Sequence, residues 1–226
     1  MPSIIAHRGA SGREFENSRA AFARAVELGA DGVELDVHST SDGIVVVHHD
    51  AELEGLGPIG HLDYMEIQEF RLPNGETVPT LPEVLEILSG LDVYVEIKSL
   101  APAFDPHLLA VLEQGPTPDR YAIHSFDHRI IARLGAERPA LPRGILMAAY
   151  PVDPVGLMRA AGADTIWQDF RLIDPAMVNA VHGAKGKLIA WTVNQPRDAV
   201  RLAGIGVDGL CGNYPDRLRA TLKETR

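Results

Sequence analysis

Three acidic residues interrupt two short apolar runs. Glu34 and Asp36 lie within residues 33–37, and Glu96 lies within residues 93–97. Successive side chains of a strand point to opposite faces, so the carboxylates share one face and the apolar residues share the other. Buried acids on neighbouring strands repel one another unless a cation offsets their charge, which predicts a bound Mg²⁺ or Ca²⁺, with Mn²⁺ as a further candidate. Zinc is disfavoured because no His and Cys set has a suitable spacing.

Basic side chains stand beside these acids and at the ends of other apolar runs. His7 and Arg8 follow one run, His49 follows another, and Lys98 shares a strand face with Glu96. Taken one at a time, His7 would be the end of a strand, Arg8 a surface charge, and Lys98 the partner of Glu96 in a buried ion pair. Taken together they suit phosphodiester cleavage, in which one group deprotonates the nucleophile and another protonates the leaving alkoxide. His7 and His49 could divide those roles, and Lys98 could hold a phosphate oxygen.

Two tryptophans lie in strand-like apolar runs, each near the carboxyl end of its own run. A tryptophan in a barrel more often belongs to the core than to a ligand pocket, although a position at the end of a strand favours the mouth. Trp191 therefore stays ambiguous from its position alone, and Trp167 is interpreted as core.

The elements that must position these residues alternate regularly along the chain. Apolar or β-branched runs alternate with helical patterns, as in repeated βα units around a parallel sheet. Eight units favour a closed (β/α)8 TIM barrel over a doubly wound open sheet, and no Gly-x-Gly-x-x-Gly turn indicates a dinucleotide site. The strands of a barrel end at one mouth, where such enzymes build their sites. The expected strands are residues 4–6, 32–37, 93–97, 121–125, 144–147, 165–168, 188–193 and 209–211, with 44–47 beside the second.

Helical patterns fill the intervals between these strands. Asp105, Asp153 and Asp174 each precede a proline, which predicts an N-cap carboxylate followed by proline at the first helical position. Residues 50–80 interrupt the rhythm with several glycines and prolines around a short helical patch at 63–70, and this insertion is expected over the mouth of the barrel. The expected helices are residues 18–28, 81–88, 106–113, 128–135, 154–161, 175–182, 196–203 and 215–222.

Composition limits the classes of protein and of partner. The chain has 226 residues, close to the roughly 250 of one TIM barrel, so a single domain over residues 1–226 is expected. A net charge of −10 without dense Lys and Arg runs disfavours nucleic acid. The single cysteine, Cys211, allows no intrachain disulfide, and neither a signal peptide nor a membrane span is visible, so a cytoplasmic location without stable membrane insertion is expected. A homo-oligomer is compatible with the sequence.

Motifs along nearly the whole chain make it resemble the glycerophosphodiester phosphodiesterase family, whose wider barrel group includes phosphatidylinositol-specific phospholipases C. The resemblance implies that His7 and His49 form the acid and base pair, and that Glu34, Asp36 and Glu96 bind the metal. It also implies that Arg8 and Lys98 hold phosphate oxygens, that Trp191 lines the pocket, and that a small-molecule glycerophosphodiester is the substrate. The motifs are His7-Arg8-Gly9, Glu16-Asn17-Ser18, residues 32–36, residues 42–50, residues 79–85, Glu96-Ile97-Lys98, Ser125-Phe126-Asp127, residues 191–194 and Val207-Asp208-Gly209.

The chain departs from this family directly after His49-Asp50. The usual Arg-Thr-Thr tract is replaced by residues 53–57, so the short insertion could leave the site open to bulky head groups. A lysophospholipase D activity is therefore an alternative, as is a related barrel lyase or phospholipase on intact lipid. A catalytically silent phosphoester-binding barrel would usually lack one of these histidines or carboxylates. A metal-dependent aldolase or isomerase shares the fold, because fold alone does not decide chemistry.

Overall fold

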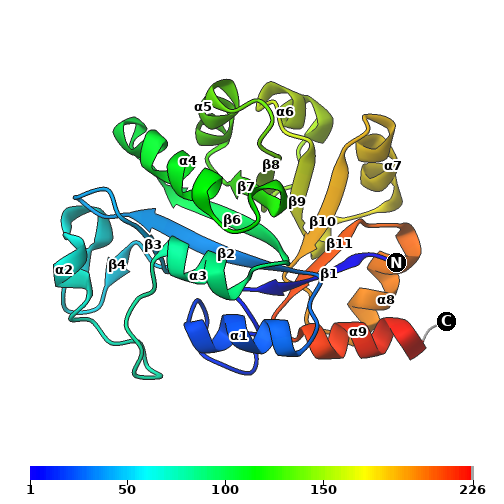
Figure 1. Ribbon diagram of the computed structural model, residues 1–226. Helices are drawn as coiled ribbons and strands as arrows, with labels where there is room; N and C mark the ends of the chain where they lie inside the picture. Colours follow the sequence, from blue (N-terminus) through cyan, green and yellow to red (C-terminus); the bar gives the residue numbers. More distant parts are fainter. Residues whose placement is uncertain (225–226) are drawn as a thin grey trace.

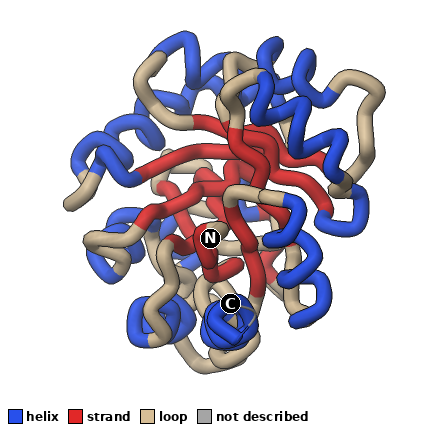
Figure 2. The backbone as a smooth tube through the Cα atoms, turned by 90° about the vertical axis from the view of Figure 1, so that its right-hand side faces the viewer, coloured by secondary structure: helices blue, strands red, loops and turns tan. Residues whose placement is uncertain are grey.

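The computed structural model describes residues 1–224, in which eight parallel strands close into a barrel with helices around it (Figures 1 and 2). The first strand pairs with both the second and the last, so this sheet has no open edge. The predicted (β/α)8 barrel is therefore confirmed. The barrel strands are β1 (Ser3–His7), β2 (Gly32–Ser39), β6 (Asp92–Ser99), β7 (Tyr121–Ser125), β8 (Arg143–Met147), β9 (Thr165–Asp169), β10 (Lys187–Trp191) and β11 (Gly209–Gly212), and β3 (Val45–Val47) pairs antiparallel beside β2.

One principal α-helix follows each barrel strand, and most of these helices begin as their sequences predict. Asp153 and Asp174 accept hydrogen bonds from the backbone N–H groups of Gly156 and Met177, both at 2.8 Å. The helices around the barrel are α1 (Arg19–Glu27), α3 (Leu81–Ile87), α4 (Asp105–Gln114), α5 (His128–Glu137), α6 (Pro154–Ala160), α7 (Pro175–Gly183), α8 (Pro196–Ile205) and α9 (Pro215–Glu224), with 3-10 turns η2 (Pro102–Phe104), η3 (Pro118–Arg120) and η4 (Phe170–Leu172).

The prediction for Asp105 was wrong. Phe104 occupies the N-cap, and Asp105 is the first residue of α4. Its side chain is buried and its Oδ1 accepts a hydrogen bond from Nη2 of Arg133 on α5 at 2.9 Å. The Asp105 carboxylate therefore forms a tertiary ion pair with Arg133 and does not make the capping interaction that the sequence pattern predicts.

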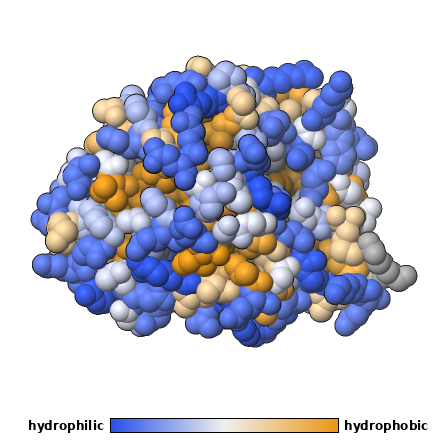
Figure 3. All heavy atoms as spheres, in the orientation of Figure 1, coloured by the Kyte–Doolittle hydropathy of each residue, from blue (hydrophilic) through white to orange (hydrophobic). Residues whose placement is uncertain are grey.

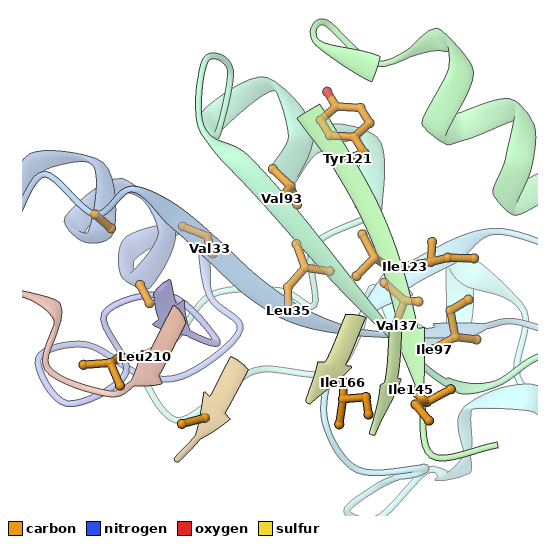
Figure 4. Packing of buried hydrophobic residues seen from close by; sticks show 14 of the residues in the cluster. Val33, Leu35, Val37, Val93, Ile97, Tyr121, Ile123, Ile145, Ile166 and Leu210 are labelled. Carbon is orange, nitrogen blue, oxygen red and sulfur yellow. The ribbon is translucent and has the colours of Figure 1, made fainter. Parts of the chain in front are cut away.

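The core lies between the barrel and its helices. Val33, Leu35 and Val37 point outward from β2 into this layer, where apolar residues of the neighbouring strands join them (Figure 4). A smaller apolar cluster lies inside the barrel and includes Ile5, Leu146, Trp167, Ile189 and Cys211. The alternation that the sequence predicts therefore separates an apolar outer face from an inner face that carries Glu34 and Asp36.

The insertion folds around its own small core. It contains β4 (Glu52–Leu53), β5 (Gly57–Pro58), η1 (Ile59–His61) and α2 (Tyr64–Ile67), which begins with a capping box between Asp63 and Glu66. Its apolar residues pack against Val46 of β3, and none of residues 50–80 lines the pocket described below. The position of the insertion over the mouth stays a prediction.

The surface drawn in Figure 3 is mainly hydrophilic, with separate apolar patches between charged side chains. Within residues 1–224, no helix has both the length and the apolar character that crossing a membrane requires.

Candidate active site

A pocket of about 190 Å³ opens among the carboxyl ends of the barrel strands. It gathers side chains from β1, β2, β6 and β10 that lie far apart in the sequence. Seven of the eight predicted site residues line it, and the exception is Asp36, which is completely buried against Arg8 and Lys98. The seven are His7, Arg8, Glu34, His49, Glu96, Lys98 and Trp191.

Asp36 lies between the two basic residues of the pocket. Its Oδ1 is 2.9 Å from Lys98 Nζ, and its Oδ2 is 3.1 Å from Arg8 Nε. Asn17 Nδ2 donates a further hydrogen bond to Oδ2 at 2.7 Å. Burial alone would raise the pKa of Asp36, but Lys98 and Arg8 outweigh it and lower the pKa to about 2. Asp36 is therefore a fixed negative charge that holds both cations at the mouth.

Arg8 owes its position to the turn that follows β1. Its backbone has a φ of 55°, an uncommon conformation for a non-glycine residue. In this turn its N–H donates to Glu34 Oε2 at 3.1 Å, and its Nη1 donates to Glu16 Oε1 at 2.7 Å. The backbone and the guanidinium are thus both held by acids, which directs the positive charge into the pocket.

Glu34 and Glu96 are buried at the base of the pocket. Burial, reinforced by the neighbouring carboxylates, raises the pKa of Glu34 well above its ordinary value. Burial and Asp36 raise the pKa of Glu96 to about 7, although Lys98 Nζ lies 2.6 Å from Glu96 Oε1. These two neighbouring buried carboxyl groups resist ionisation, and a bound cation would stabilise their ionised forms.

His7 is the last residue of β1, and its ring is fixed by the opposite end of the chain. Its Nδ1 lies 2.9 Å from Asn213 Oδ1, just after β11, and its Nε2 lies 3.9 Å from Glu34 Oε2. Burial, together with the positive charge of Arg8, lowers the pKa of His7 to about 4. The imidazole is therefore neutral near pH 7.

The structure separates the two adjacent histidines that follow β3. His49 lines the pocket, and its Nδ1 lies 2.8 Å from Asp50 Oδ1. His48 instead packs edge-on against Phe70 of the insertion, with ring centroids 6.4 Å apart. His38 Nε2 lies 3.1 Å from the carbonyl oxygen of His49, which anchors the backbone of this turn. Neither His38 nor Asn213 is predicted from the sequence.

His124 is the most informative site residue that is not predicted from the sequence. It lies on β7 beside Glu96, is 1% exposed, and its ring stacks on Trp167 with centroids 4.2 Å apart. The signal was available, because His124 alternates with Ile123 and Ser125 as Glu34 and Asp36 alternate with their apolar neighbours. Trp167, interpreted as core, is buried as expected, but its ring also lines the pocket.

The donor atoms at the pocket base fit a cation. One ligand atom from each of Glu34, Glu96 and His124 lies within 4.8 Å of the others. Glu34 Oε1 and both ring nitrogens of His124 are buried and have no hydrogen-bond partner within residues 1–224. Buried polar atoms without partners are costly, and a cation would satisfy them. Asp36 stays a predicted ligand, and binding through its Oδ1 requires Lys98 to release that atom.

Comparison with known proteins yields one consistent set of relatives. A model of the "Glycerophosphoryl diester phosphodiesterase family" matches residues 7–217. A glycerophosphodiester phosphodiesterase of Caldanaerobacter subterraneus subsp. tengcongensis is 34% identical over 231 residues, covering 95% of each chain. A probable glycerophosphodiester phosphodiesterase of Mycobacterium tuberculosis is 34% identical over 238 residues, covering 96% of this chain and 89% of the relative. The solved structure of an Oleispira antarctica phosphodiesterase, in complex with the product sn-glycerol-3-phosphate, has a TM-score of 0.92 and 26% identity, covering 99% of this chain and 97% of that one.

Proposed function

Because this chain belongs to the glycerophosphoryl diester phosphodiesterase family, we propose that it is a metal-dependent enzyme that hydrolyses glycerophosphodiesters to an alcohol and glycerol 3-phosphate. Two histidines, two basic side chains and buried carboxylates meet in one pocket, and this convergence carries the proposal. The product complex of the Oleispira antarctica phosphodiesterase supports the same substrate class.

Arg8 and Lys98 would bind the phosphodiester. Both line the pocket, and Asp36 holds both in place. A guanidinium and an ammonium offer several N–H donors to phosphate oxygens, and their charge complements the anionic substrate. Glu16 and Asp36 hold the Arg8 guanidinium in place, so little conformational entropy is lost when substrate binds.

His7 and His49 would share the proton transfers. Asn213 Oδ1 accepts a hydrogen bond from Nδ1 of His7, so Nε2 of the neutral ring carries the lone pair that a general base needs. His7 would therefore act as the general base that accepts the proton of the nucleophile. His49 would then protonate the leaving alcohol through Nε2, since its Nδ1 faces Asp50.

Glu34 and Glu96 would hold the divalent cation, with Asp36 as the further carboxylate that the family resemblance implies. When bound, the cation polarises a phosphoryl oxygen and offsets the charge that develops there. The carboxylates alone favour Mg²⁺ or Ca²⁺, with Mn²⁺ also acceptable. Trp191 and Phe126, which meet edge to face with centroids 5.6 Å apart, would line the space for the head group.

A product assay tests this function. The chelator-stripped protein is incubated with glycerophosphocholine or glycerophosphoethanolamine, with and without Mg²⁺, Ca²⁺ or Mn²⁺, and released glycerol phosphate is quantified. We expect metal-dependent release that His7→Ala abolishes and that His107→Ala, on the exposed face of α4, leaves unchanged. Absence of release with every metal would contradict the proposal and favour a silent phosphoester-binding barrel.

Lysophospholipids are a second candidate substrate class. Phe126 lines the pocket yet is 48% exposed, so it offers an apolar surface next to the head-group space. An acyl chain could lie against this ring. If glycerophosphocholine is cleaved while turnover of a lysophosphatidylcholine is undetectable, this second activity is excluded.

A further inference from the structure

His124 offers a nitrogen atom to the base of the pocket. It lies on β7 opposite Glu96 of β6, and is almost completely buried. Neither ring nitrogen has a hydrogen-bond partner in the described part of the chain. An imidazole is both a donor and an acceptor, so leaving both nitrogens buried without partners is costly.

The packing of His124 fixes where its nitrogens point. The ring stacks on Trp167 with an angle of 8° between the planes, which restricts rotation of the imidazole. Nε2 then lies 3.8 Å from Glu34 Oε1. This distance exceeds a hydrogen bond, yet two ligands of one ion, each roughly 2.1 Å from it, are separated by up to about 4.2 Å.

The distance between His124 and Glu34 suits two ligands of one ion. Neither Glu34 Oε1 nor a ring nitrogen of His124 has a hydrogen-bond partner in the described part of the chain. At 3.8 Å, Nε2 and Oε1 are too far apart for a direct hydrogen bond, and a cation between them would satisfy both atoms.

We propose that His124 binds the same cation as Glu34, Glu96 and the predicted ligand Asp36, and that this added nitrogen makes the site prefer first-row transition ions to Mg²⁺ and Ca²⁺. Imidazole suits such ions better than it suits the alkaline earths, which favour oxygen. This inference rests on the proposed function only in taking the ion to be the one that serves the reaction.

Pulsed electron paramagnetic resonance of the Mn²⁺-loaded full-length protein tests nitrogen coordination directly, without substrate. We expect modulation from a ¹⁴N nucleus bound to the ion. Labelling only the histidines with ¹⁵N should replace this modulation by that of ¹⁵N. Modulation that is absent, or that does not respond to histidine labelling, would overturn the proposal.

A matched pair of variants then identifies the histidine. His124→Gln should abolish the nitrogen modulation and weaken Mn²⁺ binding, measured by calorimetry, by about tenfold or more. The control is His38→Gln, because His38 is also buried but directs its Nε2 to the carbonyl of His49. His38→Gln should keep the modulation. Modulation that survives in His124→Gln and disappears in His7→Gln or His49→Gln would contradict the assignment.

Ion selectivity gives a second readout. The wild-type protein should bind Mn²⁺ at least about tenfold more tightly than Ca²⁺, and His124→Gln should reduce this ratio toward one. A ratio that His124→Gln leaves unchanged would contradict the proposal. If His124→Gln does not fold, the histidine modulation should persist in both His7→Gln and His49→Gln, and its loss in either variant would contradict the assignment to His124.

The two proposals fail in different ways. Metal-dependent hydrolysis without nitrogen modulation would reject His124 as a ligand and leave the phosphodiesterase function intact. Histidine modulation without hydrolysis of any glycerophosphodiester would keep the metal site and reject the function.

Discussion

Asn213, just beyond the last strand of the barrel, holds His7 at the end of the first, with 2.9 Å between Oδ1 and Nδ1. Asn194 Oδ1 in turn accepts a hydrogen bond from the backbone N–H of Asn213 at 2.8 Å. The closure of the barrel therefore sets the tautomer of the proposed general base. An amide oxygen only accepts, so the ring proton stays on Nδ1 and Nε2 faces Glu34.

Removal of this amide should impair catalysis without impairing binding. Asn213→Ala frees the ring of His7, so we expect kcat to fall about tenfold or more while KM changes less than about twofold. Asn213→Asp restores an oxygen acceptor and should recover part of kcat. Asn74→Ala, in the exposed turn of the insertion, is the control. A change confined to KM would argue that Asn213 acts on substrate instead.

The two pocket histidines should affect proton transfer but not metal binding. His7→Gln and His49→Gln should each lower kcat by about 10²- to 10⁴-fold, because each removes a proposed proton carrier. Calorimetric titration with Mn²⁺ should give dissociation constants within about twofold of the wild type. A parallel loss of metal affinity would identify the altered histidine as a ligand and remove its assignment to proton transfer.

The barrel was predictable because each local pattern agrees with the closed sheet. Val33, Leu35 and Val37 alternate with Glu34 and Asp36, and both the outward and the inward sets lie as that alternation predicts. Most element ends differ by at most two residues, as at β2, which extends to Ser39, whereas α2 ends at Ile67, three residues before the end of the predicted patch.

The parts that were not predicted depend on contacts between distant segments. Asp105 pairs with Arg133, which local capping rules cannot reveal. His124 becomes a candidate ligand only when the register places it beside Glu96, and Asn213 meets His7 only when the barrel closes. The predicted burial of Trp167 is confirmed, but its place in the pocket lining arises only in the folded barrel.

Lys98 should stabilise the metal-free protein. Its Nζ contacts both Asp36 and Glu96, so Lys98→Met leaves buried Glu96 without its basic partner and Asp36 with Arg8 alone. We expect the free energy of unfolding in chelator to fall by about 3 kcal/mol, and saturating Mn²⁺ to restore part of it. Urea titrations with and without Mn²⁺ measure both quantities. The control is Lys187→Met, at an exposed position, and an equal loss in both variants would contradict this role.

His124 should make the stability of the metal-free protein depend on pH. Its folded pKa, about 3, lies below its ordinary value of 6.5, so the unfolded chain takes up the proton first. The contribution of the neutral His124 ring to the free energy of unfolding is therefore at its full value above pH 6.5, and it is lost as the pH falls toward 3. Between about pH 6.5 and pH 4, the wild type should lose roughly 3 kcal/mol more than His124→Gln. Urea titrations in chelator check this, and parallel profiles would contradict it.

Trp191 should discriminate among head groups by their charge. Its ring lines the pocket and meets Phe126 edge to face, so one aromatic surface is available to the leaving alcohol. A quaternary ammonium over such a ring gains about 0.5 to 2 kcal/mol, whereas an uncharged head group gains only apolar contact.

Trp191→Leu should therefore lower kcat/KM for glycerophosphocholine about tenfold, and for glycerophosphoglycerol by less than about threefold, when both are assayed under the same metal conditions. Trp191→Phe keeps an aromatic face and should retain most of the preference. Equal losses for the two substrates would indicate that Trp191 shapes the pocket without recognising charge, because loss of packing affects both substrates alike.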